Sequence, residues 1–101
     1  MNLLDNAKDV LIERKVTHPK IIIKTIFSNN QVKVNIMDNA GGIDSHIIDK
    51  IFDIYFSTKR EKGGSGLGLY MSKLIIERKG MGQLSVFNEE DGAVFSITLR
   101  L

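Results

Sequence analysis

The chain has 101 residues, which suits one small domain with a modest core. Lysine and arginine total 14 against 12 aspartates and glutamates, and this net charge of +2 argues against a nucleic-acid-binding protein. The lack of cysteine excludes a disulfide scaffold and a thiolate metal site, and neither a signal peptide nor an apolar run of about 18 residues is present, so a cytoplasmic setting is expected.

The first predicted element is an amphipathic helix over residues 2–15. Its apolar residues follow helical spacing, with Leu3, Ala7 and Val10 on one side. The polar stripe on the opposite side consists of Asn2, Asn6, Asp9 and Glu13. No capping residue precedes this pattern, which indicates that the sequence is a fragment of a longer domain.

Residues 21–27 and 31–37 are rich in β-branched residues and predict a hairpin. The isoleucine triplet at 21–23 places apolar side chains on both faces of the first strand, so both faces are expected to need cover. A turn cluster comes next, followed by a predicted short helix at 45–52 and an aperiodic loop at 53–65.

A further helix is predicted over residues 67–79 and ends at Gly80. One of its faces carries Leu67, Met71, Leu74 and Ile75. The runs 83–87 and 93–101 predict a second hairpin. The resulting order of helices and strands predicts an α+β fold, a two-layer sandwich with the helices packed on one face of a mixed β-sheet.

Four glycines between residues 63 and 68 lead directly into this helix. The segment fits neither the Walker A motif, nor the dinucleotide-binding fingerprint, nor the nucleophile elbow. A glycine loop that enters a helix still exposes N–H groups at the positive end of the helix dipole, where phosphate binds. Lys59, Arg60 and Lys62 precede the segment and would neutralise a polyphosphate. The alternative is an exposed loop with solvated charges.

Two other groups of residues offer oxygen atoms to a ligand. The polar stripe with Asn2, Asn6 and Asp9 would suit a Mg²⁺ ion that accompanies a polyphosphate, although an ordinary solvated helix face has the same pattern. Asp38 ends an apolar strand, and its carboxylate would accept a hydrogen bond from an amino group such as that of adenine. The small residues Ala40, Gly41 and Gly42 would let a flat base approach the backbone. The alternative for Asp38 is an Asx-turn.

Four segments of the chain, in this order, resemble the sequence boxes of one family. "NLLDNAKDVL" is similar to the N box, "DNAGGI" to the G1 box, "IFDIYFSTK" to the F box and "GGSGLGL" to the G2 box of the ATP-binding catalytic domain of bacterial sensor histidine kinases. That family shares its fold, a Bergerat-type ATP-binding fold, with gyrase, the mismatch-repair ATPase and the 90-kDa heat-shock chaperone. "GAVFSITL" is similar to the closing strand of the family, so the resemblance covers essentially the whole chain.

The resemblance implies ATP and Mg²⁺ as cofactors and a role for particular residues. Asn6 would coordinate Mg²⁺, Asp38 would bind the adenine amino group with Gly42 beside the base, and Lys59 would lie near the phosphates. The residues expected to wrap the triphosphate are Gly64, Gly66, Leu67 and Gly68.

The chain also departs from the family pattern. Ala40 stands where the family most often has glycine, and the segment between the F and G2 boxes is short. Asn2 takes the place of the glutamate that activates water in the related ATPases, which favours phosphoryl transfer to another protein over hydrolysis. Neither His18 nor His46 resembles the phosphoacceptor of the family, so no catalytic residue is assigned in the chain.

The resemblance implies residues 1–101 to be a partial ATP-binding domain of a protein-histidine kinase, inactive by itself. In the parent protein it would transfer the γ-phosphate of ATP to a histidine of a dimerisation domain. This transfer would serve two-component signalling, with a response regulator as an indirect partner. A parent anchored in a membrane is compatible with this role. One alternative is a protein-serine kinase of the anti-sigma-factor type, and another is a nucleotide-binding module without transferase activity. The exposed apolar strand edges expected of a fragment predict a homodimer or larger oligomer, formed by edge pairing or by exchange of the first helix.

Overall fold

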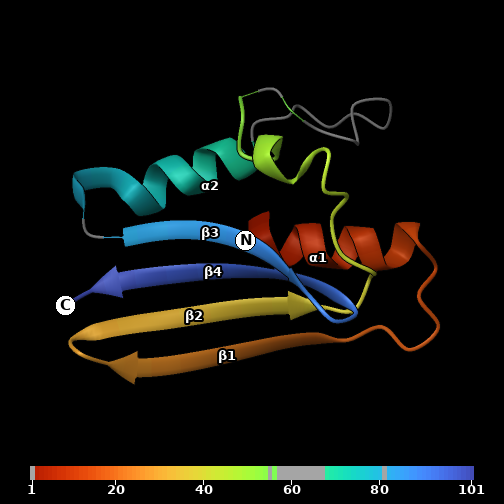
Figure 1. Cartoon of the computed structure of the whole chain (residues 1–101), viewed down its shortest axis with the longest axis horizontal. Helices are drawn as coiled ribbons and strands as arrows, with labels where there is room; N and C mark the ends of the chain where they lie inside the picture. Colours follow the sequence, from red (N-terminus) through yellow and green to blue (C-terminus); the bar gives the residue numbers. More distant parts are fainter. Residues whose placement is uncertain (1, 55, 57–67, 81) are drawn as a thin grey trace.

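A computed structural model describes residues 2–54, 56, 68–80 and 82–101. These residues form two layers, in which the α-helices lie over one face of a four-stranded sheet (Figure 1). The helices are α1 (Asn2–Glu13) and α2 (Gly68–Glu77), with short 3₁₀ helices η1 (Ile48–Lys50) and η3 (Arg78–Gly80). The strands are β1 (Ile21–Ser28), β2 (Gln31–Asp38), β3 (Gly82–Glu89) and β4 (Gly92–Arg100).

The strands are arranged in the order β1-β2-β4-β3. Both predicted hairpins are present, and in the first of them Asn29 and Asn30 have φ of 53° and 61°, as a two-residue hairpin turn requires. The α+β class and the two-layer arrangement are therefore confirmed. The expectation of a mixed sheet is not met within the described residues, because each hairpin is antiparallel and β4 also pairs antiparallel with β2.

The core lies between the helices and the sheet. Its buried cluster consists of Leu3, Ile36, Ile51, Leu84, Phe95 and Ile97. Helix α1 buries a stripe at the spacing of four residues, formed by Leu3, Ala7 and Leu11. The Phe52 ring meets the Phe95 ring edge to face, with the centroids 6.1 Å apart, and so ties the segment after η1 to β4. Packing on this cluster places α1 across β2 and beside α2.

The helix predicted at residues 45–52 is wrong in its extent. Only Ile48–Lys50 forms a short 3₁₀ helix, within a series of turns. The side chain of Asp44 accepts a hydrogen bond from the His46 backbone (2.8 Å), and its carbonyl oxygen accepts two more from residues 47 and 48. Such local bonds close tight turns instead of extending a helix.

Helix α2 packs through a different face from the apolar one that the sequence singles out. Leu69 and Ile76 pack against the core, whereas Met71, Leu74 and Ile75 are exposed. Helix α2 lies over β3 at the edge of the sheet (Figure 1). In this position the side of α2 that carries Leu69 and Ile76 faces the core. The chain leaves the helical region at Gly80, whose φ of +70° confirms the predicted stop.

Strand β1 forms one edge of the sheet and is exposed along its whole length. Its apolar side chains Ile22, Ile23, Ile26 and Phe27 all remain accessible, Phe27 to 67%. The cover expected for both faces of the isoleucine triplet is thus not supplied by the described residues. Among those residues, no helix is long and apolar enough to cross a membrane.

Candidate functional site

Asp38 lies at the carboxyl end of β2 and is half-buried. Its Oδ1 accepts a hydrogen bond from the backbone N–H of Ala40 (3.0 Å) and a longer one from that of Ala93 in β4 (3.4 Å). The first of these bonds is the Asx-turn that the sequence allows. A carboxylate has about four acceptor positions, so this turn is compatible with a further bond from a ligand.

The turn at residues 39–43 follows Asp38 and contains two glycines in the left-handed region. Gly41 has a φ of +97° and Gly42 a φ of +87°. A Cβ atom at Gly42 would lie only 2.9 Å from the side-chain oxygen of Asn88. The structure therefore shows that Gly42 is needed for the close approach of Asn88, a protein contact that the sequence did not reveal.

Asn6 is placed on α1, directly before the buried Ala7, and is half-buried. No cluster of three or more histidine, aspartate or glutamate side chains suited to a metal ion occurs in the described part of the chain. Since Mg²⁺ often takes only one or two protein ligands together with phosphate oxygens and water, a single amide oxygen is compatible with it.

The other predicted phosphate-binding residues lie mostly outside the described residues: Lys59, Gly64, Gly66 and Leu67, together with Arg60 and Lys62. Gly68 is the first residue of α2, and its carbonyl oxygen accepts a hydrogen bond from the Ser72 hydroxyl (2.9 Å). The prediction that the glycine segment leads into a helix is confirmed at this residue. The structure describes Asn6, Asp38, Gly42 and Gly68, which come from α1, the end of β2, the turn after it and the start of α2.

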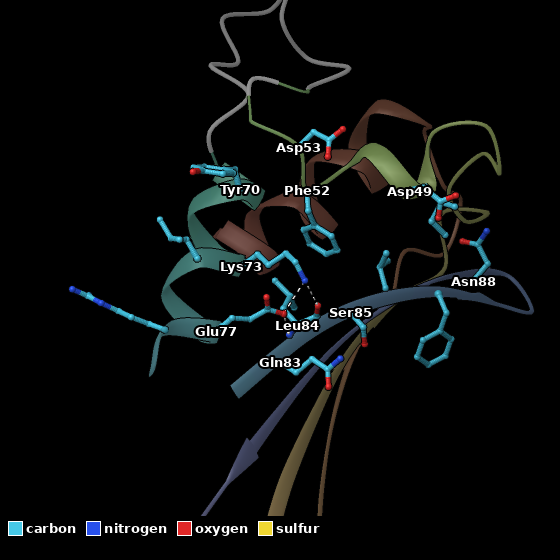
Figure 2. A pocket seen from close by; sticks show the side chains of 15 residues that line it. Asp49, Phe52, Asp53, Tyr70, Lys73, Glu77, Gln83, Leu84, Ser85 and Asn88 are labelled. Atoms are coloured by element: carbon cyan, nitrogen blue, oxygen red, sulfur yellow. Dashed lines mark hydrogen bonds and ion pairs between the residues drawn. The ribbon is translucent and has the colours of Figure 1, made fainter. Parts of the chain in front are cut away.

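A cavity of about 840 Å³ lies elsewhere, between α2, β3 and the segment around η1 (Figure 2). None of the predicted site residues lines it. Lys73 projects into it and donates to Glu77 Oε2 (2.8 Å) and to the Leu84 carbonyl (3.1 Å), with its Nζ 5.2 Å from the centre of the Phe52 ring. Sequence reasoning missed this arrangement, although the helical spacing of Lys73 and Glu77 was a signal for the ion pair.

Glu77 connects α2 to β3. Its Oε2 accepts from Lys73 and also from the backbone N–H of Leu84 (3.1 Å). The hydrogen bond from the Lys73 ammonium lowers the pKa of Glu77 below the ordinary value, helped by the Leu84 N–H and the charge of Lys73, while partial burial opposes the change. Lys73 and Glu77, which both line this cavity, thus balance each other's charge.

The comparison with protein families gives a match along the whole chain. A family model described as "Histidine kinase-, DNA gyrase B-, and HSP90-like ATPase" matches residues 1–101. The chain is 34% identical over 107 aligned residues to "Two-component sensor PprA" of Pseudomonas aeruginosa, covering 100% of this chain and 11% of that protein. It is 38% identical over 101 residues to "Signal transduction histidine-protein kinase AtoS" of Escherichia coli K12, covering 98% of this chain and 16% of AtoS. The chain thus spans less than a fifth of these relatives.

Solved structures show the same fold. The nucleotide-free catalytic domain of histidine kinase ThkA superposes with a TM-score of 0.76 at 30% identity, covering 98% of this chain and 60% of that one. Full-length ShkA, solved in complex with AMPPNP, superposes with a TM-score of 0.73 over 97% of this chain and 20% of that one, and at 23% identity this likeness concerns the fold alone. Since both the family model and relatives above 30% identity cover nearly all of it, the chain belongs to the histidine kinase-, DNA gyrase B- and HSP90-like ATPase family and corresponds to the ATP-binding catalytic portion of sensor histidine kinases.

Proposed function

We propose that the chain binds Mg²⁺-ATP with the adenine at Asp38, and that a longer protein uses it to phosphorylate a histidine on a separate dimerisation domain. The observation that carries the proposal is the Asp38 carboxylate, which two backbone N–H groups hold at the end of a half-buried strand. An acceptor fixed in this way can recognise an amino group without reorganising first.

The remaining residues would act on the phosphates. Asn6 would supply one oxygen to Mg²⁺, and the glycines at 64, 66 and 68, with Leu67, would direct backbone N–H groups at the triphosphate. Lys59 would add a positive charge near the phosphates. When bound, ATP supplies the phosphoryl group. The role of this chain is to position that group and to balance its charge, which is most of what phosphoryl transfer requires.

The partner in this proposal is a histidine-bearing dimerisation domain in the parent protein, which passes the phosphoryl group on to a response regulator in the cytoplasm. PprA and AtoS, by their names, are a two-component sensor and a signal-transduction histidine kinase. Since residues 1–101 cover a small share of such proteins, we propose that they form part of a kinase and are inactive without the acceptor domain.

Calorimetric titration of the chain with a non-hydrolysable ATP analogue, with and without Mg²⁺, tests the binding step. We expect saturable binding that strengthens with Mg²⁺, because the ion joins the phosphates to Asn6. Mixing the chain with a dimerisation domain from a sensor kinase and radiolabelled ATP then tests the transfer step. Absence of analogue binding by the folded chain would contradict the proposal.

The two alternatives lead to different results in the same assays. A serine kinase of the anti-sigma-factor type would yield acid-stable phosphoserine, whereas phosphohistidine is acid-labile. A nucleotide-binding module would bind the analogue and label no acceptor.

A further inference from the structure

The turn at residues 39–43 is held by side chains that come from distant parts of the chain. Arg14 follows the last turn of α1, where its backbone N–H still donates to the Val10 carbonyl (3.0 Å). Its Nη1 donates to the carbonyl oxygens of Ala40 (2.6 Å) and Gly42 (2.8 Å). One guanidinium nitrogen therefore donates hydrogen bonds to two carbonyl groups of the same turn. Hydrogen bonds from a charged donor are stronger than those between neutral groups.

The opposite ends of the same two peptide groups are also bonded. In a trans peptide the N–H points away from the C=O, so fixing both groups fixes the plane. The Gly41 N–H donates to the Asp91 carbonyl (2.6 Å), and the Ile43 N–H donates to Asn88 Oδ1 (2.8 Å). Both peptide planes that Arg14 binds are thus held from both sides.

Asn88 makes a second contact that strengthens this arrangement. Its Nδ2 donates to the Ile43 carbonyl (2.7 Å), so its amide pairs with both backbone groups of one residue. Asn88 lies on β3 and projects toward the turn. The absence of a Cβ at Gly42 makes room for this amide.

We infer that Arg14 and Asn88 are positioning residues for the nucleotide, which hold the turn beside Asp38 in its binding geometry before any ligand arrives. This inference rests on the proposed function. The Ala40 N–H that orients the Asp38 carboxylate belongs to this turn, so movement of the turn would also release Asp38. A site that is already ordered binds more tightly, because no binding free energy is spent on ordering it.

Arg14→Met removes the guanidinium and keeps much of the apolar stem, and Asn88→Leu removes the amide pair. We expect each variant to weaken adenosine and the ATP analogue by the same factor, about 5- to 20-fold, because both ligands depend on the adenine end of the site. Binding of Mg²⁺-tripolyphosphate should not change. Arg14→Lys keeps one charged donor and should recover part of the loss, while Arg100→Met, at an exposed strand end, is the matched control.

Amide hydrogen exchange of the ligand-free chain gives a second readout. The Gly41 and Ile43 amides should exchange faster in Arg14→Met, while amides in the middle of β4 stay protected.

Unchanged adenosine affinity in a folded Arg14→Met or Asn88→Leu variant overturns the inference and leaves the proposed function standing. If the unaltered chain binds neither adenosine nor the analogue, the proposed function itself fails. Should either variant unfold, Arg14→Lys and Asn88→Asp provide the same test with milder changes, and exchange at Gly41 identical to the unaltered chain would contradict the inference.

Discussion

Asp38 shows how one residue can have a structural role and a binding role at once. Its Oδ1 holds the turn through Ala40 and contacts β4 through Ala93. Asp38→Asn keeps an oxygen for these N–H groups, but turns an amide donor toward the place where the adenine amino group is proposed to bind. We expect a native circular dichroism spectrum and a loss of ATP-analogue affinity of about 1–3 kcal/mol, or roughly 5- to 150-fold, in calorimetry. Asp53→Asn, at an exposed position, is the control, and equal affinities for all three proteins would contradict the role of Asp38.

Asn6 is expected to act on the phosphates alone. Asn6→Ala removes one proposed Mg²⁺ ligand, so Mg²⁺-ATP affinity should fall while adenosine affinity changes little, because adenosine has no phosphate to share the ion. A single lost hydrogen bond or ligand contact of this kind costs about 1 kcal/mol or more. The two affinities are measured by the same titration. An equal loss for both ligands would mean that Asn6 supports the fold of α1 and does not bind the ion.

At the scale of elements, the Lys73–Glu77 pair joins α2 to the edge strand β3. The pKa of Glu77 is lowered in the folded chain, chiefly by its hydrogen bond from Lys73. The ionised carboxylate therefore stabilises the fold at pH values above the ordinary glutamate pKa of 4.5. This contribution is lost as the pH falls through the lowered folded-state pKa. Glu77→Gln should therefore reduce the free energy of unfolding at neutral pH, by less than about 1 kcal/mol because both side chains are about one-third exposed.

The measurement for Glu77→Gln is urea unfolding at neutral pH and again in acid, well below the ordinary glutamate pKa. The difference from the unaltered chain should disappear in acid, where Glu77 is protonated and resembles glutamine. Glu13→Gln, at the exposed end of α1, controls for the loss of a negative charge. A difference that persists unchanged in acid would show that the ion pair does not support the contact between α2 and β3.

At the scale of the whole molecule, strand β1 is an edge of the sheet that no other described strand covers, and it exposes apolar side chains on both faces. Such an edge pairs readily with another strand. We expect two copies of this chain to associate along β1, which would join their sheets, pair the backbone groups of this edge and reduce the exposure of Ile22, Ile23 and Ile26. Light scattering should show a mass that rises with concentration, and Ile23→Lys should lower it, since lysine on an edge strand opposes pairing. A monomer at every concentration would contradict this prediction.

The elements and the family boxes could be predicted from the sequence because they depend on short-range order. Helical spacing located α1 and α2, and short runs of strand-forming residues located both hairpins. The position of Asp38 at the end of an apolar strand was sufficient to mark it as a candidate acceptor. These features depend on neighbours within a few residues, so a single chain read in order reveals them.

Only the tertiary structure decided which face of each element is used and which distant side chains meet. Helix α2 packs through Leu69 and Ile76 because its place over β3 turns the more apolar face outward. Arg14 binds carbonyl groups 26 and 28 residues away, and Asn88 binds Ile43 across 45 residues, contacts that no local pattern encodes. Periodicity shows that a face is apolar or that a turn is present. What covers the face, and what holds the turn, depends on how all the elements pack together around one core.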